Sequence, residues 1–465
     1  MNEKIKNILH DIYESVKGTE QNFTEGKLGR AILLLSVPMV LEMAMESVFA
    51  VVDIFFVSKL GSEAVATVGI TESVMTILYA ISLGLGMGTT ALIARRVGEG
   101  KMKDASITAA QSISLGVILS IPIAVAGIYF APDLLEIMGS SESMIENGFR
   151  YPQIVIGFNI VIMLLFIINS IFRGAGDASL SMRILWISNF INIILDPCLI
   201  FGLGPFPEMG IAGAATATVI GRGVGVLAQL YLLFNGKHRI KIRINDFRLR
   251  IKLMFKLIRI SLGGIGQFLI STTSWIGLVR IMSTFGSSVL AGYTIAIRII
   301  IFSLLPSWGL SNAASTMVGQ NLGAKKPGRA ERSVIITAKI NFVFLTFIAV
   351  MFFLFAEEFV EIFTSEPAVV LAGKEALRFI SIIFPFYAIG MVMIQALNGS
   401  GDTRTPTIIN FFCFWLTELP VAYILSMKLG FHAHGVYLAI ILADIMIATI
   451  GIIVFRRGKW KLKVV

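Results

Sequence analysis

The sequence predicts an all-α integral membrane protein with twelve transmembrane helices in two parallel six-helix lobes around a central cleft. Three observations support this prediction. Apolar residues make up 56% of the 465 positions and charged residues only 15%, which is more apolar surface than a soluble core of this size usually hides. The apolar residues come in blocks of about 20 or more, the length that a helix needs to cross a bilayer. The second half of the chain also repeats the pattern of the first.

The first 27 residues are predicted to form an amphipathic segment at the cytoplasmic membrane surface. Ile5, Ile8, Leu9, Ile12 and Val16 fall at helical spacing, which is typical of a short helix lying on a membrane. The stretch lacks the uncharged apolar core of a cleavable signal peptide.

Six apolar blocks then form the predicted N-terminal lobe, residues 28–235. Their ranges are about 30–58, 62–94, 105–131, 147–172, 178–203 and 210–235. A basic cytoplasmic linker, residues 236–252, leads to the predicted C-terminal lobe, residues 253–455. The six blocks of that lobe are about 256–284, 287–318, 331–356, 370–397, 405–428 and 433–455, and residues 456–465 are a basic cytoplasmic tail.

The formal net charge of +10 is distributed by loop, which argues against a nucleic-acid partner. Lys and Arg gather in every second loop, such as ARRVGEGKMKD and GAKKPGRAER, whereas loops such as AEEFVEIFTSEP are acidic. This alternation is the positive-inside pattern, and it places both termini and the basic loops in the cytoplasm. We therefore expect a multi-pass protein of the plasma (inner) membrane, in contact with membrane lipids and without a nucleic-acid partner.

No motif predicts catalysis or a bound cofactor. The sequence has no Walker motif for ATP, and its four scattered His residues offer no base for a nucleophile. Cys198 and Cys413 lie in predicted helices without a partner pattern, and His432 and His434 lack a third metal ligand. We expect a monomeric protein that is not an enzyme and uses neither a cofactor nor ATP.

The internal repeat is seen when the chain is compared with itself at a shift of 225 residues. KLGSEAVATVGI from Lys59 aligns with TFGSSVLAGYTI from Thr284, and IFRGAGD ending at Asp177 aligns with ALNGSGD ending at Asp402. Because six spans begin and finish on one side of the membrane, the two lobes are parallel repeats related by a pseudo-twofold axis along the membrane normal. A transported molecule would bind in the cleft between the lobes, near mid-membrane.

Three carboxylates stand in the first span, within LEMAMESVFAVVDIFFV, residues 41–57. At about 100° per residue, Glu46 lies about 40° and Asp53 about 20° around the helix axis from Glu42, so the three share one stripe. A carboxylate at the centre of a membrane helix costs on the order of 2.5–3.5 kcal/mol, which indicates a function. The alternatives are a headgroup or a cationic partner for Glu42, and a helix cap near the outer face for Asp53.

Other polar residues lie in the fifth block and in the second half. Asn192 and Asp196 are spaced i, i+4 and so share a helix face. At the repeat shift, Glu42, Glu46 and Asp53 fall on Gln267, Ser271 and Leu278, so the C-terminal lobe has lost the acidic stripe. Glu418 is a candidate for that lobe's side of the cleft, and Asp444 is interpreted as structural.

The twofold array of six spans, together with VGQNLGAKKPGRAE, RGAGD, NGSGDTRTP, VVDIFFVSKLG and NIILDPCLIFG, resembles the multidrug and toxic compound extrusion (MATE) transporters, and in particular their DinF-like and archaeal-type branch. The resemblance covers nearly the whole chain after about Asn22. It implies a secondary active multidrug exporter, which exchanges small cationic amphipathic organic compounds for H⁺ or Na⁺ by alternating access.

The resemblance also implies a cation-coupling site in the N-terminal lobe. In that branch the site combines an aspartate of the first helix, an asparagine and an aspartate of the fifth and a threonine of the sixth, which match Asp53, Asn192, Asp196 and Thr218. Thr216 is the alternative to Thr218. Na⁺ at Asp53, Asn192 and Asp196 and a proton on the two acids both fit this set of oxygens.

The cleft is expected to change shape at Pro38, which matches a proline that bends the first helix in that branch. Its predicted lining joins acids that favour cations to an adaptable apolar wall, and comprises Glu42, Glu46, Met43, Gln267, Trp275 and Glu418.

Two other functions stay open. A flippase for lipid-linked precursors belongs to the same superfamily, but such proteins often carry a strongly cationic cavity, whereas the intramembrane charges of this sequence are mostly acidic. A non-transporting membrane receptor or assembly protein needs no coupled carboxylates, and a null result in ion-driven uptake into vesicles would favour it.

Overall fold

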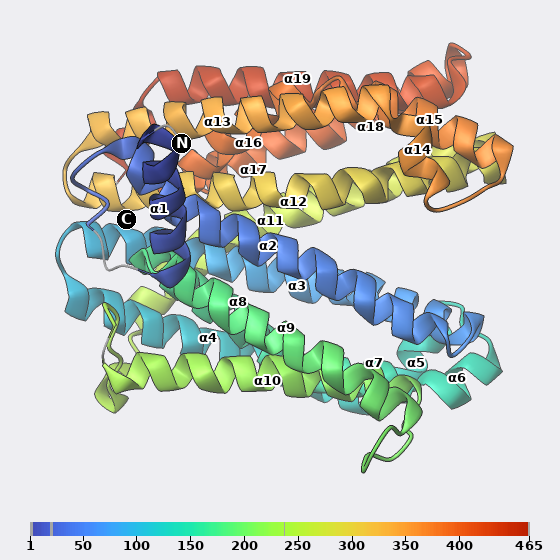
Figure 1. Ribbon diagram of the computed structural model, residues 1–465, viewed down its shortest axis with the longest axis horizontal. Coiled ribbons are helices and arrows are strands. Elements are labelled where there is room, and N and C mark those ends of the chain that lie inside the picture. Colours follow the sequence, from blue (N-terminus) through green and yellow to red (C-terminus); the bar gives the residue numbers. More distant parts are fainter. Residues whose placement is uncertain (1–2, 19–21, 237, 464–465) are drawn as a thin grey trace.

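The computed structural model describes residues 3–18, 22–236 and 238–463. Residues 1–2, 19–21, 237 and 464–465, which belong to the predicted N-terminal segment, linker and tail, lie outside the described residues. All regular structure in the described residues is helical, and the helices form two lobes (Figure 1).

The N-terminal lobe runs from α2 to α10. Three long helices come first, namely α2 (Leu28–Ser58), α3 (Ser62–Gly98) and α4 (Met102–Tyr129). Two short helices, α5 (Ala131–Ile137) and α6 (Glu142–Gly148), lead to a pair bent by 41°, α7 (Arg150–Gly157) and α8 (Asn159–Ala175). The lobe ends with α9 (Ala178–Phe201) and α10 (Ile211–Asn235).

The C-terminal lobe repeats this order. It begins with α11 (Ile251–Met282), the short turn η2 (Ser283–Phe285), α12 (Ser287–Gly323) and α13 (Pro327–Leu354). The short α14 (Ala356–Glu361) leads to a pair bent by 55°, α15 (Pro367–Ser381) and α16 (Phe384–Gly399). One further span contains α17 (Arg404–Asn410), the π-helical η3 (Phe411–Glu418), α18 (Leu419–Tyr423) and the π-helical η4 (Ile424–Lys428). The last elements are α19 (His432–Arg456) and η5 (Lys459–Leu462).

The number of membrane spans agrees with the predicted fold class. Within the described residues, nine helices are long and apolar enough to cross a membrane, and the two bent pairs bring the number to eleven. The 31-residue α2, which carries the three carboxylates, packs against α9 and α12 and completes twelve spans, six in each lobe. The twelve-helix, two-lobe fold is therefore confirmed.

Each bend has a structural cause. Pro385 in the first turn of α16 has no N–H to donate to the preceding helix, so α15 and α16 cannot form one continuous ladder. At the other bend, Asn159 Nδ2 donates to the carbonyls of Ile156 at 2.7 Å and Ser120 at 3.1 Å, which satisfies backbone oxygens there.

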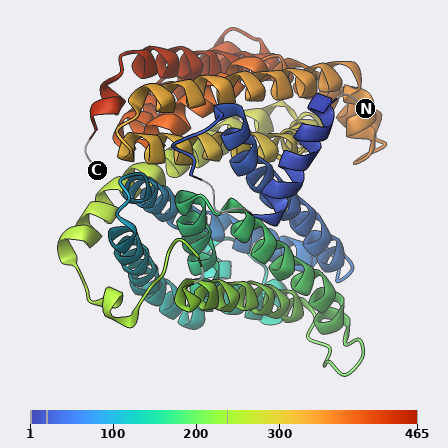
Figure 2. The same cartoon turned by 60° about the vertical axis from the view of Figure 1, so that its left-hand side comes forward.

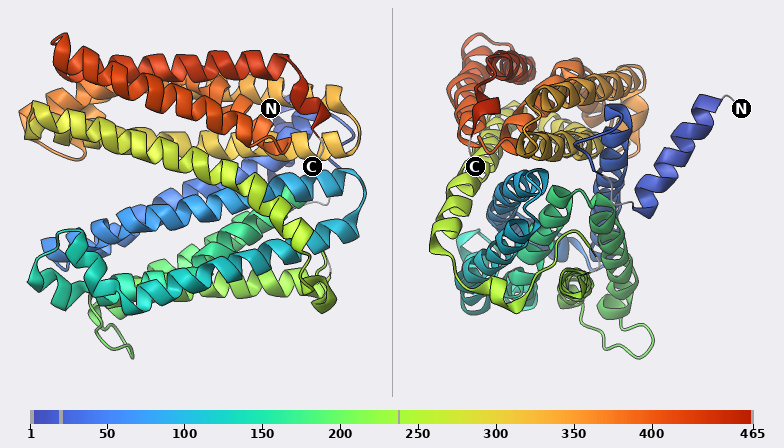
Figure 3. Two further views of the ribbon diagram at one scale, coloured as in Figure 1. Left: turned by 180° about the vertical axis from the view of Figure 1, so that it is seen from behind. Right: turned by 90° about the vertical axis from the view of Figure 1, so that its left-hand side faces the viewer.

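The lobes touch at one end of the bundle, which we call the termini end because α1 and η5 both lie there (Figures 1 and 3). Backbone approaches backbone closely at this contact: a Cβ on Gly98 would lie 1.9 Å from the carbonyl oxygen of Gln320, and one on Gly323 2.2 Å from that of Arg95. Toward the other end, which holds α5, α6 and α14 and which we call the far end, the helices of the two lobes diverge (Figure 3).

The N-terminal segment connects the lobes at the termini end. The predicted helix is present as α1 (Glu3–Lys17), and it is held on α2 by an ion pair of 2.9 Å between Asp11 and Arg30. Further along, the guanidinium of Arg329 in α13 donates to the carbonyls of Phe23, Glu25 and Gly26. Figure 2 shows this segment in dark blue beside the C-terminal lobe.

The linker between the lobes is attached to α4. Its short helix η1 (Ile244–Phe247) presents Asp246, whose Oδ1 lies 2.7 Å from Lys103 Nζ. Gln111 Nε2 donates to the carbonyls of Asp246 and Arg248. Burial opposes ionisation of Asp246, but hydrogen bonds from Lys103 and from the Arg243 amide outweigh it and hold the pKa below its usual value.

Candidate functional site

The structure brings three of the four predicted ion-coupling residues into contact, in the half of the N-terminal lobe nearer the far end. Asn192 and Asp196 are buried on α9, and Thr218 stands near the start of α10. Asn192 Nδ2 lies 3.2 Å from Thr218 Oγ1 and 3.5 Å from Asp196 Oδ1. Thr216, the alternative, donates instead to the carbonyl of Ala212 at 2.8 Å, within its own helix.

Asp53 is the fourth predicted residue, and it interacts with the site by electrostatics and not by direct contact. It is half-buried near the end of α2 and forms no ion pair or hydrogen bond with a described residue. Its carboxylate lies within electrostatic range of both Asp196 and Arg222. Asp53 and Asp196 are therefore close enough for their charges to interact, but no hydrogen bond joins them.

Two acceptor atoms of this site have no donor. Asn192 Oδ1 and Asp196 Oδ2 are buried, and neither accepts a hydrogen bond from a described residue. A buried acceptor without a partner is costly, so both oxygens are suited to receive a proton or a small cation. In the described part of the chain, no group of three or more His, Cys, Asp or Glu side chains is placed to hold a metal ion.

Arg222 on α10 is a member of the site that sequence reasoning missed. It is 4% exposed, its Nη2 lies 3.7 Å from Glu46 Oε2, and its guanidinium carbon is 5.2 Å from the centre of the Phe49 ring. A signal for it was present, because Arg222 stands four residues after Thr218 and so shares its helix face. A search for the cation that balances the acidic stripe would have found it.

Arg222 cannot balance all the carboxylates that face it. Glu46 and Asp53 both lie within its electrostatic range, as does the exposed Glu72 of α3, and Asp196 adds a further negative charge beside Asp53. We call Glu46, Asp53, Asp196 and Arg222 the acidic cluster. With every carboxylate ionised the cluster carries surplus negative charge, and uncompensated charge in a membrane-spanning lobe is unfavourable.

Glu42 has a cationic partner of its own, one of the two alternatives considered for it. Arg173 Nη1 at the end of α8 lies 2.9 Å from Glu42 Oε1, and Arg173 Nη2 donates to Ser170 Oγ at 3.0 Å. Glu42 is only 1% exposed, so its side chain does not reach an open surface in this structure. Sequence reasoning also missed Arg173, which belongs to the RGAGD loop and not to an apolar block.

The repeat places a neutral pair at the same position of the other lobe. At the 225-residue shift, Glu42 and Arg173 correspond to Gln267 and Asn398. These two amides exchange hydrogen bonds of 3.1 Å in both directions, and Gln395 extends the network from Asn398 at 3.0 Å. Both lobes therefore have a polar side-chain pair at this position, and only the pair in the N-terminal lobe is ionic. This repetition favours a structural role for the pair.

The other predicted cleft residues lie in several elements. Met43 on α2 is half-buried, and Trp275 on α11 is 45% exposed. Glu418 in η3 is buried and accepts a hydrogen bond of 2.6 Å from Ser274 Oγ, so it has a local partner within the C-terminal lobe. The contribution of these side chains to a cleft stays a prediction.

Pro38 stands where α2 meets the other lobe. The helix continues through this proline, which cannot donate a backbone hydrogen bond to the preceding turn. On the adjacent residue, the carbonyl oxygen of Met39 lies 2.6 Å from where a Cβ of Gly309 in α12 would be. The weakest turn of α2 therefore packs directly on the backbone of α12.

Comparisons with known proteins agree with this architecture. The MatE family model matches residues 38–198 and 264–424, one stretch in each lobe. The chain is 27% identical over 450 residues to the "Probable multidrug resistance protein NorM" of Thermotoga maritima, which covers 94% of both chains. It is 29% identical over 415 residues to an "FAD transporter" of Shewanella oneidensis, covering 88% of this chain and 89% of the relative.

A solved structure shares the whole fold. A MOP superfamily transporter from Pyrococcus furiosus aligns with a TM-score of 0.87 at 27% identity, over 95% of this chain and 98% of that one. The matched stretches, one per lobe, and the shared twelve-helix fold confirm the predicted family. The chain belongs to the MatE family, the multidrug and toxic compound extrusion transporters.

Proposed function

We propose that the protein is a secondary active exporter, which moves cationic amphipathic organic compounds out of the cell in exchange for H⁺ or Na⁺. Membership of a family of membrane transporters, with relatives named for multidrug resistance, supports the export of organic compounds. The observation that carries the ion coupling is the acidic cluster, whose buried Asp196 Oδ2 and neighbouring Asn192 Oδ1 lack donors.

The surplus negative charge of the cluster gives the coupling ion its role. A proton on Asp196 or Asp53 would remove one charge, and a Na⁺ ion would do the same while using the neutral oxygens of Asn192 and Thr218. Either ion makes the site more nearly neutral, so the loaded and the unloaded lobe differ in free energy. An ion can drive a transport cycle only through such unequal affinity for two conformations.

The arrangement of the lobes indicates how the cycle would proceed. If both termini are in the cytoplasm, as the loop charges predict, the lobes touch at the inner side and their helices diverge toward the outer side (Figure 3). We propose that this arrangement is the outward-facing state of the cycle. In this orientation Asp53 and Asp196 would lie in the outer half of the lobe, and the coupling ion would enter from outside. Ion binding would favour bending of α2 at Pro38, which would shift its contact with Gly309 of α12 and reshape the cleft.

Charge pairing supports cationic substrates over anionic ones. Arg173 and Arg222, the two cations beside the acidic stripe, face Glu42 and Glu46 respectively. These two arginines therefore contribute no unpaired positive charge that could bind a pyrophosphate or a dinucleotide. A relative named as an FAD transporter makes an anionic substrate the competing case, which the same assay can test.

Purified protein in liposomes tests the function with one gradient at a time. A fluorescent cationic dye and FAD would each be followed with a pH gradient alone, a Na⁺ gradient alone, and neither, with protein-free liposomes and ionophore-collapsed gradients as controls. We expect dye movement with at least one gradient and none without. Absence of gradient-driven movement of either compound would contradict the proposal and favour a receptor, and movement of FAD alone would contradict the substrate class.

A further inference from the structure

A second feature of the molecule lies at the termini end of the C-terminal lobe. A cavity of about 590 Å³ opens between α11 and α17, and its wall includes Lys256, Arg259 and Arg404. Two aliphatic side chains of the same wall are largely exposed, Leu262 at 59% and Ile408 at 56%. Cationic and apolar surfaces therefore border one opening.

The wall of this cavity holds more cations than acids: Lys256, Arg259, Arg404 and Lys463 stand with one carboxylate, Asp402. Asp402 is the acidic residue of the wall, and its Oδ1 already pairs with Lys463 Nζ at 3.1 Å. Lys256, Arg259 and Arg404 form no ion pair or side-chain hydrogen bond with any described residue. The wall thus carries three more cations than acids, and Glu99, outside the wall, attracts Lys256 without forming an ion pair with it.

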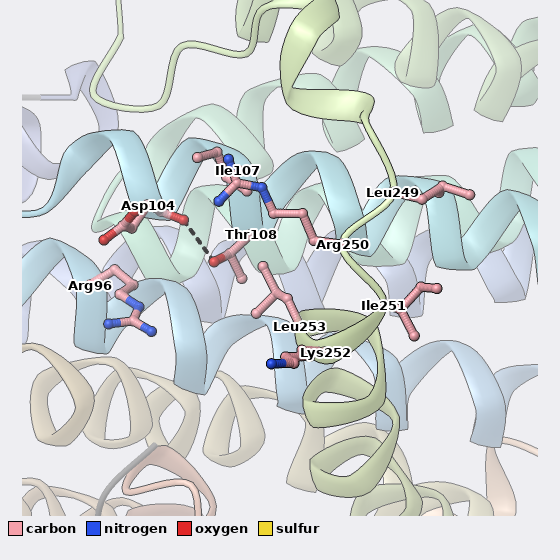
Figure 4. A pocket seen from close by; sticks show the side chains of 9 residues that line it. All are labelled: Arg96, Asp104, Ile107, Thr108, Leu249, Arg250, Ile251, Lys252 and Leu253. Carbon is pink, nitrogen blue, oxygen red and sulfur yellow. Dashed lines mark hydrogen bonds between the residues drawn. The ribbon is translucent and has the colours of Figure 1, made fainter.

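A neighbouring cavity shows the contrast. It has a volume of about 540 Å³ and lies between α4 and the end of the linker, where Arg250 and Lys252 stand (Figure 4). Its Arg96 pairs with Glu99 at 3.2 Å, and Asp104 is part of the same wall. Three cations and one acid line that cavity, and Arg96 has its own carboxylate partner, so its surplus of positive charge is smaller than the surplus of three in the cavity between α11 and α17.

The internal repeat shows what fills the equivalent groove of the other lobe. At the 225-residue shift, Lys256 and Arg259 correspond to Ala31 and Leu34 on α2, and Arg404 corresponds to Ser179 on α9.

In the N-terminal lobe, the segment that precedes α2 occupies this groove. Phe23, 3% exposed, packs in a cluster with Ala31 and Leu34, and Arg183 Nη2 donates to the carbonyl of Lys17 at 2.6 Å. The segment before α11 is bound to α4 through Asp246 and cannot take the same place. One groove is thus apolar and covered by the protein's own chain, and its repeat is cationic and open.

We propose that the cavity between α11 and α17 binds an anionic phospholipid, whose phosphate is held by Lys256, Arg259 and Arg404. Guanidinium groups bind phosphate oxygens in a bidentate manner, and each juxtamembrane cation adds to the attraction for an anionic headgroup. The acyl chains would lie along Leu262 and Ile408 on the membrane-facing side. A lipid fits better than free phosphate, because only a lipid has acyl chains that can contact these exposed apolar side chains.

The full chain in mild detergent tests the site by native mass spectrometry and by thermal unfolding with added ligand. Three probes separate the sources: dioleoyl phosphatidylglycerol, dioleoyl phosphatidylcholine with the same chains, and inorganic phosphate with none. We expect the phosphatidylglycerol to bind at least about tenfold more tightly than the phosphatidylcholine, and phosphate alone to give no stabilisation. Equal binding of the two lipids, or equal stabilisation by phosphate, would overturn the proposal.

Two triple variants with the same loss of charge locate the binding. Lys256→Gln/Arg259→Gln/Arg404→Gln should weaken phosphatidylglycerol binding about tenfold or more. The control, Arg456→Gln/Arg457→Gln/Lys459→Gln, changes three exposed cations at the same end of the molecule but outside the cavity, and should bind as the parent does. If the first triple variant does not fold, Arg404→Gln alone, at an exposed position, should still weaken binding by about threefold. Unchanged binding in the cavity variants, or an equal loss in the control, would contradict the site.

Discussion

Glu42 and Arg173 form a buried ion pair at the position where the other lobe has two amides. The pair ties α2 to the end of α8, and removal of one partner would leave an uncompensated charge inside the lobe. In the other lobe, the uncharged pair Gln267 and Asn398 ties α11 to the end of α16 in the same way. The charge of Glu42 is therefore dispensable if its partner loses its own charge at the same time.

Glu42→Ala is expected to destabilise the protein by about 3–5 kcal/mol, because Arg173 stays charged and unpaired. The double variant Glu42→Gln/Arg173→Asn copies the other lobe and should recover most of this loss. The measurement is the midpoint of thermal unfolding in detergent, followed by tryptophan fluorescence. A double variant as unstable as the single one would show that the ion pair itself is needed.

Among single residues, the sequence indicated contacts within the candidate site better than it indicated the cations that surround the site. The i, i+4 spacing placed Asn192 and Asp196 on one face, and the structure adds their contact with Thr218. The cations Arg173 and Arg222 could not be paired with the acidic stripe by periodicity within α2, because they come from α8 and α10. Only the packing of separate helices decides which charges meet.

Among the helices, α2 is the one that we expect to bend during transport. Its turn at Pro38 lacks one backbone hydrogen bond and packs on Gly309 of α12, at the contact between the lobes. A proline in a helix interior costs about 3 kcal/mol, so its replacement favours the straight helix.

Pro38→Ala is expected to fold and to bind the cationic dye, but to lower the rate of gradient-driven transport by about tenfold or more, since a bent α2 becomes less accessible. Dye binding by fluorescence and transport in proteoliposomes separate the two effects. Pro122→Ala is the matched control, because Pro122 also lies inside a membrane helix, α4, away from the lobe contact. Transport at the parent rate in Pro38→Ala would rule out bending at this turn as a required step.

The lengths of the elements followed closely from the apolar blocks, but the bends did not. The break before α16 has a sequence signal in Pro385, which the long apolar run hid. The break between α7 and α8 has none, because Asn159 stabilises it through a carbonyl of α4, at Ser120. A contact between distant segments cannot be read from the local pattern.

At the scale of the whole molecule, the two lobes are held together where the termini lie. Arg329 of α13 donates to three carbonyls of the segment before α2, which links the C-terminal lobe to the N-terminal one. The repeat predicted two parallel lobes, but it could not predict which ends touch. Which ends touch depends on the free energy that contacts such as the Arg329 hydrogen bonds contribute in each conformation.

Arg329→Ala should weaken the contact at the termini end and shift the population toward closure at the far end. Spin labels attached at Glu142→Cys in α6 and Glu361→Cys in α14, both exposed positions, measure the distance between the lobes by pulsed electron paramagnetic resonance. We expect an added population at shorter distance. Arg332→Ala, an exposed neighbour, is the control. An unchanged distance distribution in Arg329→Ala would show that this link does not hold the lobes together.

In the proposed cycle, Asp53 and Asp196 of the N-terminal lobe alone couple ion flow to export. The most direct measurement is gradient-driven dye export by Asp53→Asn and Asp196→Asn in proteoliposomes, at equal amounts of folded protein. Asp444→Asn serves as control, since Asp444 is also buried in a membrane helix but belongs to the C-terminal lobe. We predict that both cluster variants lose gradient-driven export and that Asp444→Asn retains it. Export at the parent rate in Asp53→Asn and Asp196→Asn would contradict the coupling role of these two residues.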